Sequence, residues 1–259
     1  MATSITNTTP QSSKAAPVAK QILQQVKFEL LLTARRGENV LVTLIMPLLF
    51  LVFFTSLNIV PIPNEKAVNF LLPGILAVAI IAAGMVNLGI ATAYERYYGV
   101  LKRLGSSPLS RTSLIIAKII SILILEVVQV TVLAGVAVLF YGWQPAGSVP
   151  LTLLTIALGT VTFASFGLAM AGALRAEATL AGANALFMIF LLIGGGILPL
   201  NRLPPFLADI AQVLPAAPLA QALQATMNNG SPFPATQLLT LVIWAIIILI
   251  VAIRTFKWE

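Results

Sequence analysis

The sequence predicts an all-α membrane protein with six transmembrane helices, and three observations support this class. Of the 259 residues, 59% are hydrophobic and only 9% are charged, too few polar residues to cover a soluble domain. Six apolar stretches are each long enough to cross a bilayer core of roughly 30 Å. The chain has no cysteine and no histidine, which excludes disulfides, thiolate chemistry and the usual zinc and haem ligands.

The predicted spans follow one another from residue 40 to residue 253. They cover residues 40–60, 70–93, 119–141, 149–174, 178–200 and 236–253. If the N-terminus is cytoplasmic, that side holds 13 of the 15 Lys and Arg residues, and the other side holds only Lys66 and Arg202. The positive-inside rule therefore predicts that both termini face the cytoplasm. Because orientation accounts for the net charge of +7, no nucleic-acid partner is expected.

Two segments precede the first span. Residues 1–17 are rich in Ser, Thr, Asn and Pro, which predicts a disordered cytoplasmic tail. In residues 18–38, Val18, Ile22, Val26 and Leu30 recur at helical spacing with polar residues off that line. This pattern predicts an amphipathic helix in the membrane interface, and it is equally compatible with a helix docked on protein. Residues 39–259 are expected to form the six-span transmembrane domain.

The fifth predicted span is expected to end in a broken or re-entrant turn. Gly194, Gly195 and Gly196 lie just before Pro199. Irregular backbone is tolerated at membrane depth only where it is buried in protein or lines a wet cavity. The segment 203–227 that follows is apolar enough to lie at the membrane surface or to dip into it.

Residues that could carry chemistry inside the membrane are few. Glu126 is the only ionisable residue deep in a predicted span, and Gln129 lies one turn further on the same face. The Glu126 carboxyl is either a substrate or dimer contact in a translocation pathway, or a hydrogen-bonded group that holds two helices together. Asn87 in the second span and Asn184 in the fifth raise the same question.

No enzymatic activity and no metal site are expected of this chain. It contains no Gly-Lys dipeptide, so a Walker phosphate loop cannot occur. The familiar nucleophile–base pairs also require a histidine or cysteine.

The most patterned segment outside the predicted spans is the loop of residues 95–110. Val100, Leu101 and Leu104 form a short apolar stripe, Lys102 and Arg103 lie opposite, and residues 105–108 stop the helix. Such a helix either docks on a soluble partner or anchors the loop at the bilayer surface. The pattern by itself does not choose between these interpretations.

Two motifs, one after the second predicted span and one after the fifth, resemble those of the permease subunits of the ABC-2 family of ATP-driven exporters. The loop after the family's second span reads approximately E-R-x-x-G-T-L-x-x-L-x-x-x-P-x-[ST]. The matching residues here are Glu95, Arg96, Gly99, Leu101, Leu104, Pro108 and Ser110, with Val100 in the threonine position. The family's glycine–proline pattern after the fifth span is similar to Gly195, Pro199, Leu203, Pro204 and Leu207, followed by Pro215 and Pro218, with Gly194 replacing a serine. Glu177 is a weaker third match, and the resemblance extends over nearly the whole chain from residue 18.

The resemblance implies both partners and residue roles. Two permease copies, expected to be a homodimer, would bind two copies of a separate ATPase subunit that carries ATP and Mg, so no cofactor is expected on this chain. The coupling helix would comprise Glu95, Arg96, Gly99, Leu101, Lys102, Arg103, Leu104 and Pro108, with the helix at 18–36 as a second contact. Short re-entrant helices over the exit would include Gly195, Gly196, Pro199, Pro204 and Pro215. The resemblance further implies the inner membrane of a bacterium.

The function expected from these features is outward transport of a hydrophobic or amphipathic molecule, such as a drug or a lipid. The spans are aliphatic and only 8% of the residues are aromatic, whereas conduits for sugar chains favour aromatic stacking surfaces. A polysaccharide or glycolipid substrate is the alternative within the exporter interpretation. The alternative outside it is a proton-coupled secondary transporter or channel using Glu126. That class would need further intramembrane charges and preferably an internal repeat, and the sequence shows neither.

Overall fold

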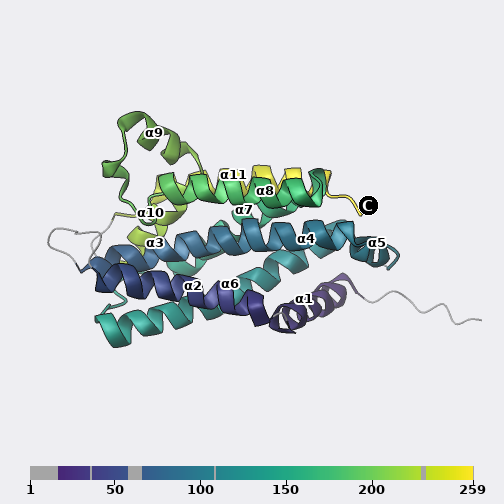
Figure 1. Cartoon of the computed structure of the whole chain (residues 1–259), viewed down its shortest axis with the longest axis horizontal. Helices are drawn as coiled ribbons and strands as arrows, with labels where there is room; N and C mark the ends of the chain where they lie inside the picture. The colour runs from purple at the N-terminus through teal and green to yellow at the C-terminus, as the bar shows by residue number, and fades with distance from the viewer. Residues whose placement is uncertain (1–16, 36, 58–65, 108, 229–231, 259) are drawn as a thin grey trace, which may run out of the picture.

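In a computed structural model the chain is a bundle of α-helices, which confirms the predicted fold class (Figure 1). The structure describes residues 17–35, 37–57, 66–107, 109–228 and 232–258, with only the backbone for residues 37–42. Residues 1–16 of the predicted tail, and Pro108 of the predicted coupling segment, lie outside this part of the chain.

Helices follow one another along the whole described chain. They are α1 (Val18–Arg35), α2 (Gly37–Ser56), α3 (Ala67–Ile81), the π-helix η1 (Ala82–Asn87), α4 (Leu88–Tyr97), α5 (Val100–Gly105), α6 (Arg111–Tyr141), α7 (Val149–Ala173), α8 (Ala176–Ile193), the 3₁₀-helix η2 (Leu200–Arg202), α9 (Pro205–Val213), α10 (Ala216–Met227) and α11 (Ala235–Thr255).

Five helices in the described part of the chain are long and apolar enough to cross a membrane. They are Ala67–Tyr97, which joins α3, η1 and α4, together with α6, α7, α8 and α11. Each coincides with one of the last five predicted spans. The first predicted span coincides with α2, whose described apolar part, Thr43–Ser56, is shorter than a full span.

Two helix ends differ from the predicted spans for identifiable reasons. The helix α6 begins at Arg111 rather than 119, because the Ser110 side chain accepts a hydrogen bond from the Ser113 amide and caps the helix. The first residues of α6 are partly polar, so a prediction from hydropathy leaves them out of the span. The helix α8 ends at Ile193 rather than 200. There Gly195 adopts a φ of 69°, a left-handed conformation that favours glycine.

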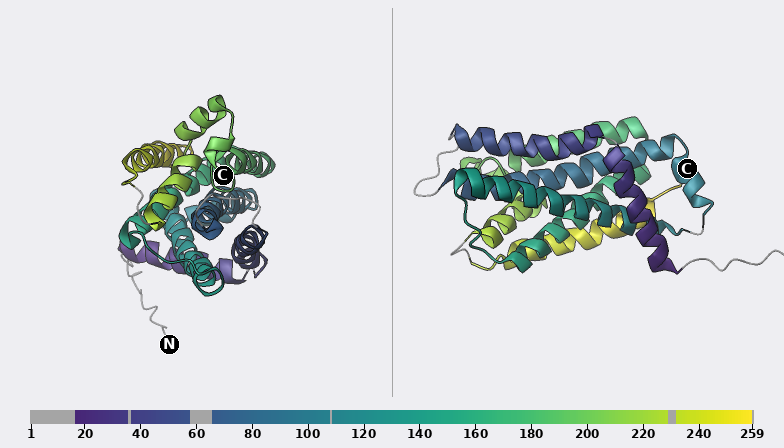
Figure 2. Two further views of the ribbon diagram at one scale, coloured as in Figure 1. Left: turned by 90° about the vertical axis from the view of Figure 1, so that its left-hand side faces the viewer. Right: turned by 90° about the horizontal axis from the view of Figure 1, so that it is seen from below.

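The centre of the bundle is built around α7, which packs against α11, α4 and η1. Glycines let the backbones meet: a Cβ atom on Gly89 would lie 2.8 Å from the Cα of Gly167. Figure 2 shows the long helices running side by side, with α1 crossing them near one end. This crossing places α1 along α6.

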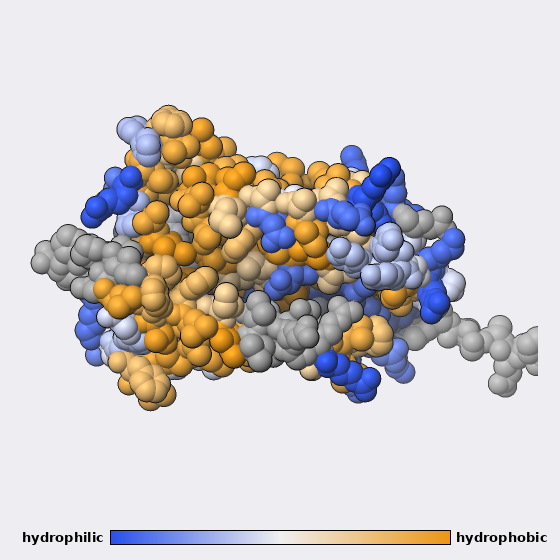
Figure 3. Space-filling model, in the orientation of Figure 1, coloured by the Kyte–Doolittle hydropathy of each residue, from blue (hydrophilic) through white to orange (hydrophobic). Residues whose placement is uncertain are grey.

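The two ends of the bundle differ in character. The end of α11, the helix α5 and α1 lie at one end, and α9 and α10 lie toward the other (Figure 1). Hydrophilic residues gather around the α5 end, and apolar residues cover most of the remaining visible face, with smaller hydrophilic groups at the opposite end (Figure 3). The described basic residues predicted to share one side of the membrane, such as Arg96, Arg111 and Arg175, belong to elements at the α5 end.

The face of α1 that contacts α6 includes part of the predicted apolar line and two polar residues. Val26 is buried together with Gln25 and Glu29, whereas Val18 is 60% exposed. The buried face is therefore mixed in character. This face of α1 carries a carboxylate because α6 supplies a cation opposite it, as described below.

The segment after α8 folds back into the bundle. The helices α9 and α10 meet at 82°, the geometry of a broken span or a re-entrant loop. Most of α10 is buried against α3, α7 and α11. The turn that precedes this pair lies directly on α3, because a Cβ atom on Gly74 would overlap the carbonyl oxygen of Gly196.

The surroundings of two helical glycines predict that alanine substitution has opposite effects on stability at the two positions. Gly74→Ala should lower the stability by about 1–3 kcal/mol, because the added methyl group meets backbone that cannot rotate away. Gly135→Ala in α6 should raise the stability by about 0.5–1 kcal/mol, because none of the described residues lies within 4 Å of its Cβ position and alanine favours the helix. Thermal unfolding of the purified protein in detergent checks both variants, and equal shifts would contradict the packing.

Candidate functional site

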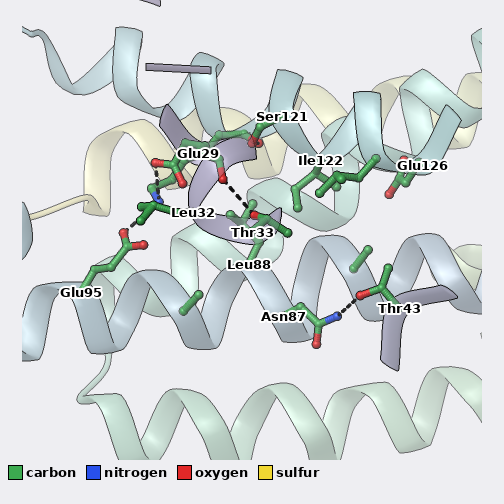
Figure 4. A pocket seen from close by; sticks show the side chains of 14 residues that line it. Glu29, Leu32, Thr33, Thr43, Asn87, Leu88, Glu95, Ser121, Ile122 and Glu126 are labelled. Atoms are coloured by element: carbon green, nitrogen blue, oxygen red, sulfur yellow. Dashed lines mark hydrogen bonds and ion pairs between the residues drawn. The ribbon is translucent and has the colours of Figure 1, made fainter. Parts of the chain in front are cut away.

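A buried cluster of three charged side chains joins α1, α4 and α6. The Lys118 Nζ atom of α6 lies 2.9 Å from Glu29 Oε1 and 2.8 Å from Glu95 Oε2, and the lysine side chain is 1% exposed. Gln25 donates a further hydrogen bond to Glu29 Oε1 at 2.9 Å. We call Glu29, Lys118 and Glu95 the charged triad. Figure 4 shows the two carboxylates converging from different helices.

The second residue of the Glu95-Arg96 pair reaches a different neighbour. Arg96 donates hydrogen bonds to the carbonyl oxygens of Gly172, at 2.8 Å, and of Leu174. These carbonyls end α7 and lack partners within the helix, so a cation there satisfies them and complements the helix dipole. Glu95 and Arg96 thus fix the end of α4 to α6 and α7 respectively.

The short helix α5 is attached to the bundle by its leucines. Gly99 adopts a φ of 72° and turns the chain from α4 into α5. Leu101 is buried and Leu104 is half-buried, and both pack in the apolar cluster around Leu114 and Phe256. The predicted apolar stripe is therefore divided, with Leu101 and Leu104 facing the bundle rather than outward.

The exposed side of α5 and of the preceding turn combines apolar, basic and aromatic side chains. Val100 is 41% exposed, and Lys102 and Arg103 are exposed as well. Tyr97 and Tyr98, next to them, are 65% and 69% exposed. This surface, and not the leucines, is available to a partner.

Glu126 is fully enclosed between α6 and α7. Its Oε2 atom accepts a hydrogen bond from the Thr160 hydroxyl, and Oε1 has no hydrogen-bond partner among the described residues. The carboxyl therefore links two helices. It also lines a small cavity of about 70 Å³ that the charged triad lines as well, with Asn87 on its wall (Figure 4).

A larger groove brings together the other three polar residues predicted inside the spans. Asn87, Gln129 and Asn184 line a space of about 250 Å³ between α2, α3–η1 and α8. Gln129 is buried and donates to the Thr43 carbonyl oxygen of α2, whereas Asn87 and Asn184 are exposed. Apart from Thr43, the rest of the described lining is apolar and includes Phe50 and Phe187. We call this space the polar-lipped groove.

The predicted outer residues lie toward the α9 end, and Gly196 packs beside Val78, which lines the groove. Gly195 and Gly196 form the turn on α3, Pro199 precedes η2, and Pro204 and Pro215 occupy the positions before α9 and α10. The Trp244 indole donates to the Val213 carbonyl at 2.8 Å and holds the end of α9 to α11. These residues shape the fold of the outer segment.

Sequence reasoning missed two members of the charged triad. Lys118 was counted only as a basic residue setting orientation, and Glu29 was assigned no role. The available signal was a carboxylate at residue 29, three positions after Val26, on the face expected to be apolar.

Comparisons with known proteins agree with the motifs. Residues 20–228 match the family described as ABC-2 type transporter. The chain is similar to the putative transport permease YvfS of Bacillus subtilis (strain 168), with 26% identity over 208 residues, 76% of this chain and 82% of the relative. It is 30% identical over 208 residues to the putative transport permease ycf38 of Porphyra purpurea, covering 75% of this chain and 69% of that protein.

A third relative is longer than the matched region. The probable multidrug ABC transporter permease YbhR of Escherichia coli (strain K12) is 25% identical over 154 residues, which are 59% of this chain and 42% of YbhR. Because the family match covers most of the chain and includes the Glu95-Arg96 loop and the glycine–proline turn, the resemblance is confirmed: this protein belongs to the ABC-2 type transporter family and is a multi-pass membrane permease.

Proposed function

We propose that this chain is the permease of an ABC exporter that moves a hydrophobic or amphipathic substrate outward. Two copies of the chain would work with two copies of a separate ATPase subunit that binds ATP and Mg. The proposed location is the inner membrane of a bacterium, with both termini in the cytoplasm and α5 facing the ATPase. The family membership supports an ATPase partner, and the excess of basic residues on one side supports the orientation.

The observation that carries this proposal is that α5 and the end of α4 contact several helices at one end of the bundle. Leu101 and Leu104 pack α5 against the bundle, Arg96 fixes the end of α4 to α7, and the charged triad ties the same end of α4 to α1 and α6. A force applied to the exposed side of α5 would therefore reach several spans at once. That arrangement suits a coupling element better than a simple surface anchor.

The polar-lipped groove is the proposed translocation surface. Exposed amides such as those of Asn87 and Asn184 are unfavourable against lipid, so they are expected to face a second copy or the substrate. The apolar lining of the groove supports a drug-like or lipid substrate over a sugar chain. The π-helix η1 forms one wall, and such segments occur often at functional sites.

The test of the exporter function is purification of the tagged chain from its native membrane, followed by assay for a co-purifying ATPase. We expect a near-stoichiometric subunit that Val100→Asp removes or uncouples, because this change places a charge on the exposed side of α5. Val100→Leu is the matched control, since it keeps an apolar side chain at the same exposed position and should retain the ATPase. Absence of any ATPase from the wild-type sample in gentle detergent would contradict the proposal.

The charged triad yields a second prediction that separates stability from coupling. Lys118→Met should destabilise the protein by about 3–5 kcal/mol, because two carboxylates remain buried without their cation. The triple variant Glu29→Gln, Lys118→Met, Glu95→Gln should recover most of that stability, since it buries no charge.

Transport measured per ATP hydrolysed should nevertheless stay low in the triple variant, because the ionic link between α1 and α4 is gone. A triple variant that is stable and fully coupled would show that the triad is only structural.

Glu126 distinguishes the exporter from a proton-coupled carrier. Glu126→Gln preserves an acceptor for the Thr160 hydroxyl, so an exporter should keep its stability and nearly all its transport. A carrier that uses this carboxyl as its proton site should stop. Transport by reconstituted vesicles, with ATP and separately with a proton gradient, decides between the two functions.

A further inference from the structure

Asn87 connects three neighbouring cavities. It lines the polar-lipped groove, the small cavity beside Glu126, and a third space of about 370 Å³ at the end of α4 nearest α5. The polar and aromatic residues of this third space are Asn87, Tyr94, Glu95 and Tyr98, and the remaining lining residues are Ile90, Ala91 and Val100. We call it the tyrosine vestibule. It lies between the α5 surface and the groove.

The vestibule offers aromatic rings to an occupant. The rings of Tyr94 and Tyr98 are stacked, with centroids 6.1 Å apart and planes at 27°. Tyr98 is 69% exposed, so much of this ring is left uncovered by the described residues. The faces of aromatic rings carry negative charge density and attract organic cations.

The residues that line the vestibule have the same sign preference, whereas Lys102 and Arg103 lie on the neighbouring exposed side of α5. Glu95 lines it and shares a single ammonium, that of Lys118, with Glu29. Two carboxylates with one ammonium leave the triad with an excess of one negative charge when all three groups are ionised. Among the described residues that line the vestibule there is no lysine or arginine. A cation is therefore favoured here and an anion is not.

The space beyond the vestibule suits an apolar body. Through Asn87 it adjoins the polar-lipped groove, whose lining is mostly aliphatic and carries amides but no charged side chain among its described residues. A molecule with a cationic head and an apolar remainder could place its head between Tyr98 and Glu95 and extend the remainder toward the groove. A uniformly polar cation would find few partners there.

We propose that the tyrosine vestibule is an entry site for organic cations, namely molecules with a quaternary or protonated amine, or a phosphonium, and an apolar body. This inference rests on the proposed exporter function and names the substrate class of its pathway. Tyr98 and Tyr94 contact the cationic head through their rings, and Glu95 supplies the compensating charge.

The experiment measures equilibrium binding of tetraphenylphosphonium to the full chain with its ATPase subunit in lipid nanodiscs. Tetraphenylborate serves as an anion of the same shape, and empty nanodiscs give the background from partitioning into lipid. We expect saturable binding of the phosphonium above background and none of the borate. No saturable phosphonium binding, or borate binding of equal affinity, would overturn the proposal.

Tyr98 gives a matched pair of variants, one without and one with an aromatic ring. Tyr98→Leu should weaken phosphonium binding about threefold to tenfold, whereas Tyr98→Phe, which keeps the ring, should leave it nearly unchanged. Phe206→Leu is the control, because Phe206 is similarly exposed (63%) but lies in α9 and does not line the vestibule. Equal losses for Phe206→Leu and Tyr98→Leu would contradict the assignment of the site.

The same samples separate this inference from the exporter function. ATPase co-purification and ATP-driven transport of an uncharged dye report on the exporter independently of cation binding. If both persist while the phosphonium does not bind, only the vestibule proposal fails. If both are absent, the exporter function itself fails.

Discussion

The buried ammonium of Lys118 is the interaction on which one end of this permease depends. Aliphatic helices pack against one another in many registers, so apolar contacts alone specify their relative positions weakly. The ion pairs of Lys118 with Glu29 and Glu95 add directional contacts at 2.9 and 2.8 Å that fix α1 and α4 against α6. Removing one partner of such a buried set costs several kcal/mol, so the ion pairs favour one relative position of the three helices.

The position of the triad gives it consequences beyond stability. Glu95 is followed by Arg96, which satisfies the terminal carbonyls of α7, and then by the turn into α5. One dipeptide therefore joins the exposed helix α5 to two long helices and, through Lys118, to α1. Within the same few turns of α4, Asn87 opens onto the groove and Tyr98 onto the vestibule. The proposed coupling and substrate contacts are thus neighbours in and beside α4.

Much of the fold follows from periodicity and turn residues visible in the sequence. Runs of apolar residues predicted the long helices, and Gly194–Gly196 before Pro199 predicted the break after α8 that Gly195 makes with its positive φ. Three polar residues in the predicted spans were candidates for pathway contacts or for hydrogen bonds between helices. They all line one groove: Asn87, Gln129 and Asn184. Helix and turn preferences were sufficient to predict the helices and the break. The cost of placing an amide inside a membrane was sufficient to identify the polar residues.

The features that the sequence did not reveal depend on contacts between distant segments. Lys118 lies 23 positions from Glu95 and still further from Glu29, so no local pattern links them. The inward direction of Leu104 is set by the cluster around Phe256, a residue near the end of the chain. A short helix such as α5 has too few turns for its own pattern to decide which side faces the bundle.

We propose that α1, α4 and α5 move as one body during the ATP cycle. It is tested most directly by the distance between spin labels on Gln24 of α1 and Arg103 of α5, measured by double electron–electron resonance in the complex with its ATPase. Both sites are exposed, and the chain has no cysteine of its own, so introduced cysteines can be labelled selectively. The account predicts the same distance distribution without nucleotide and with ATP trapped, while a label on α5 moves relative to one on α9. A distance between α1 and α5 that changes with nucleotide would contradict it.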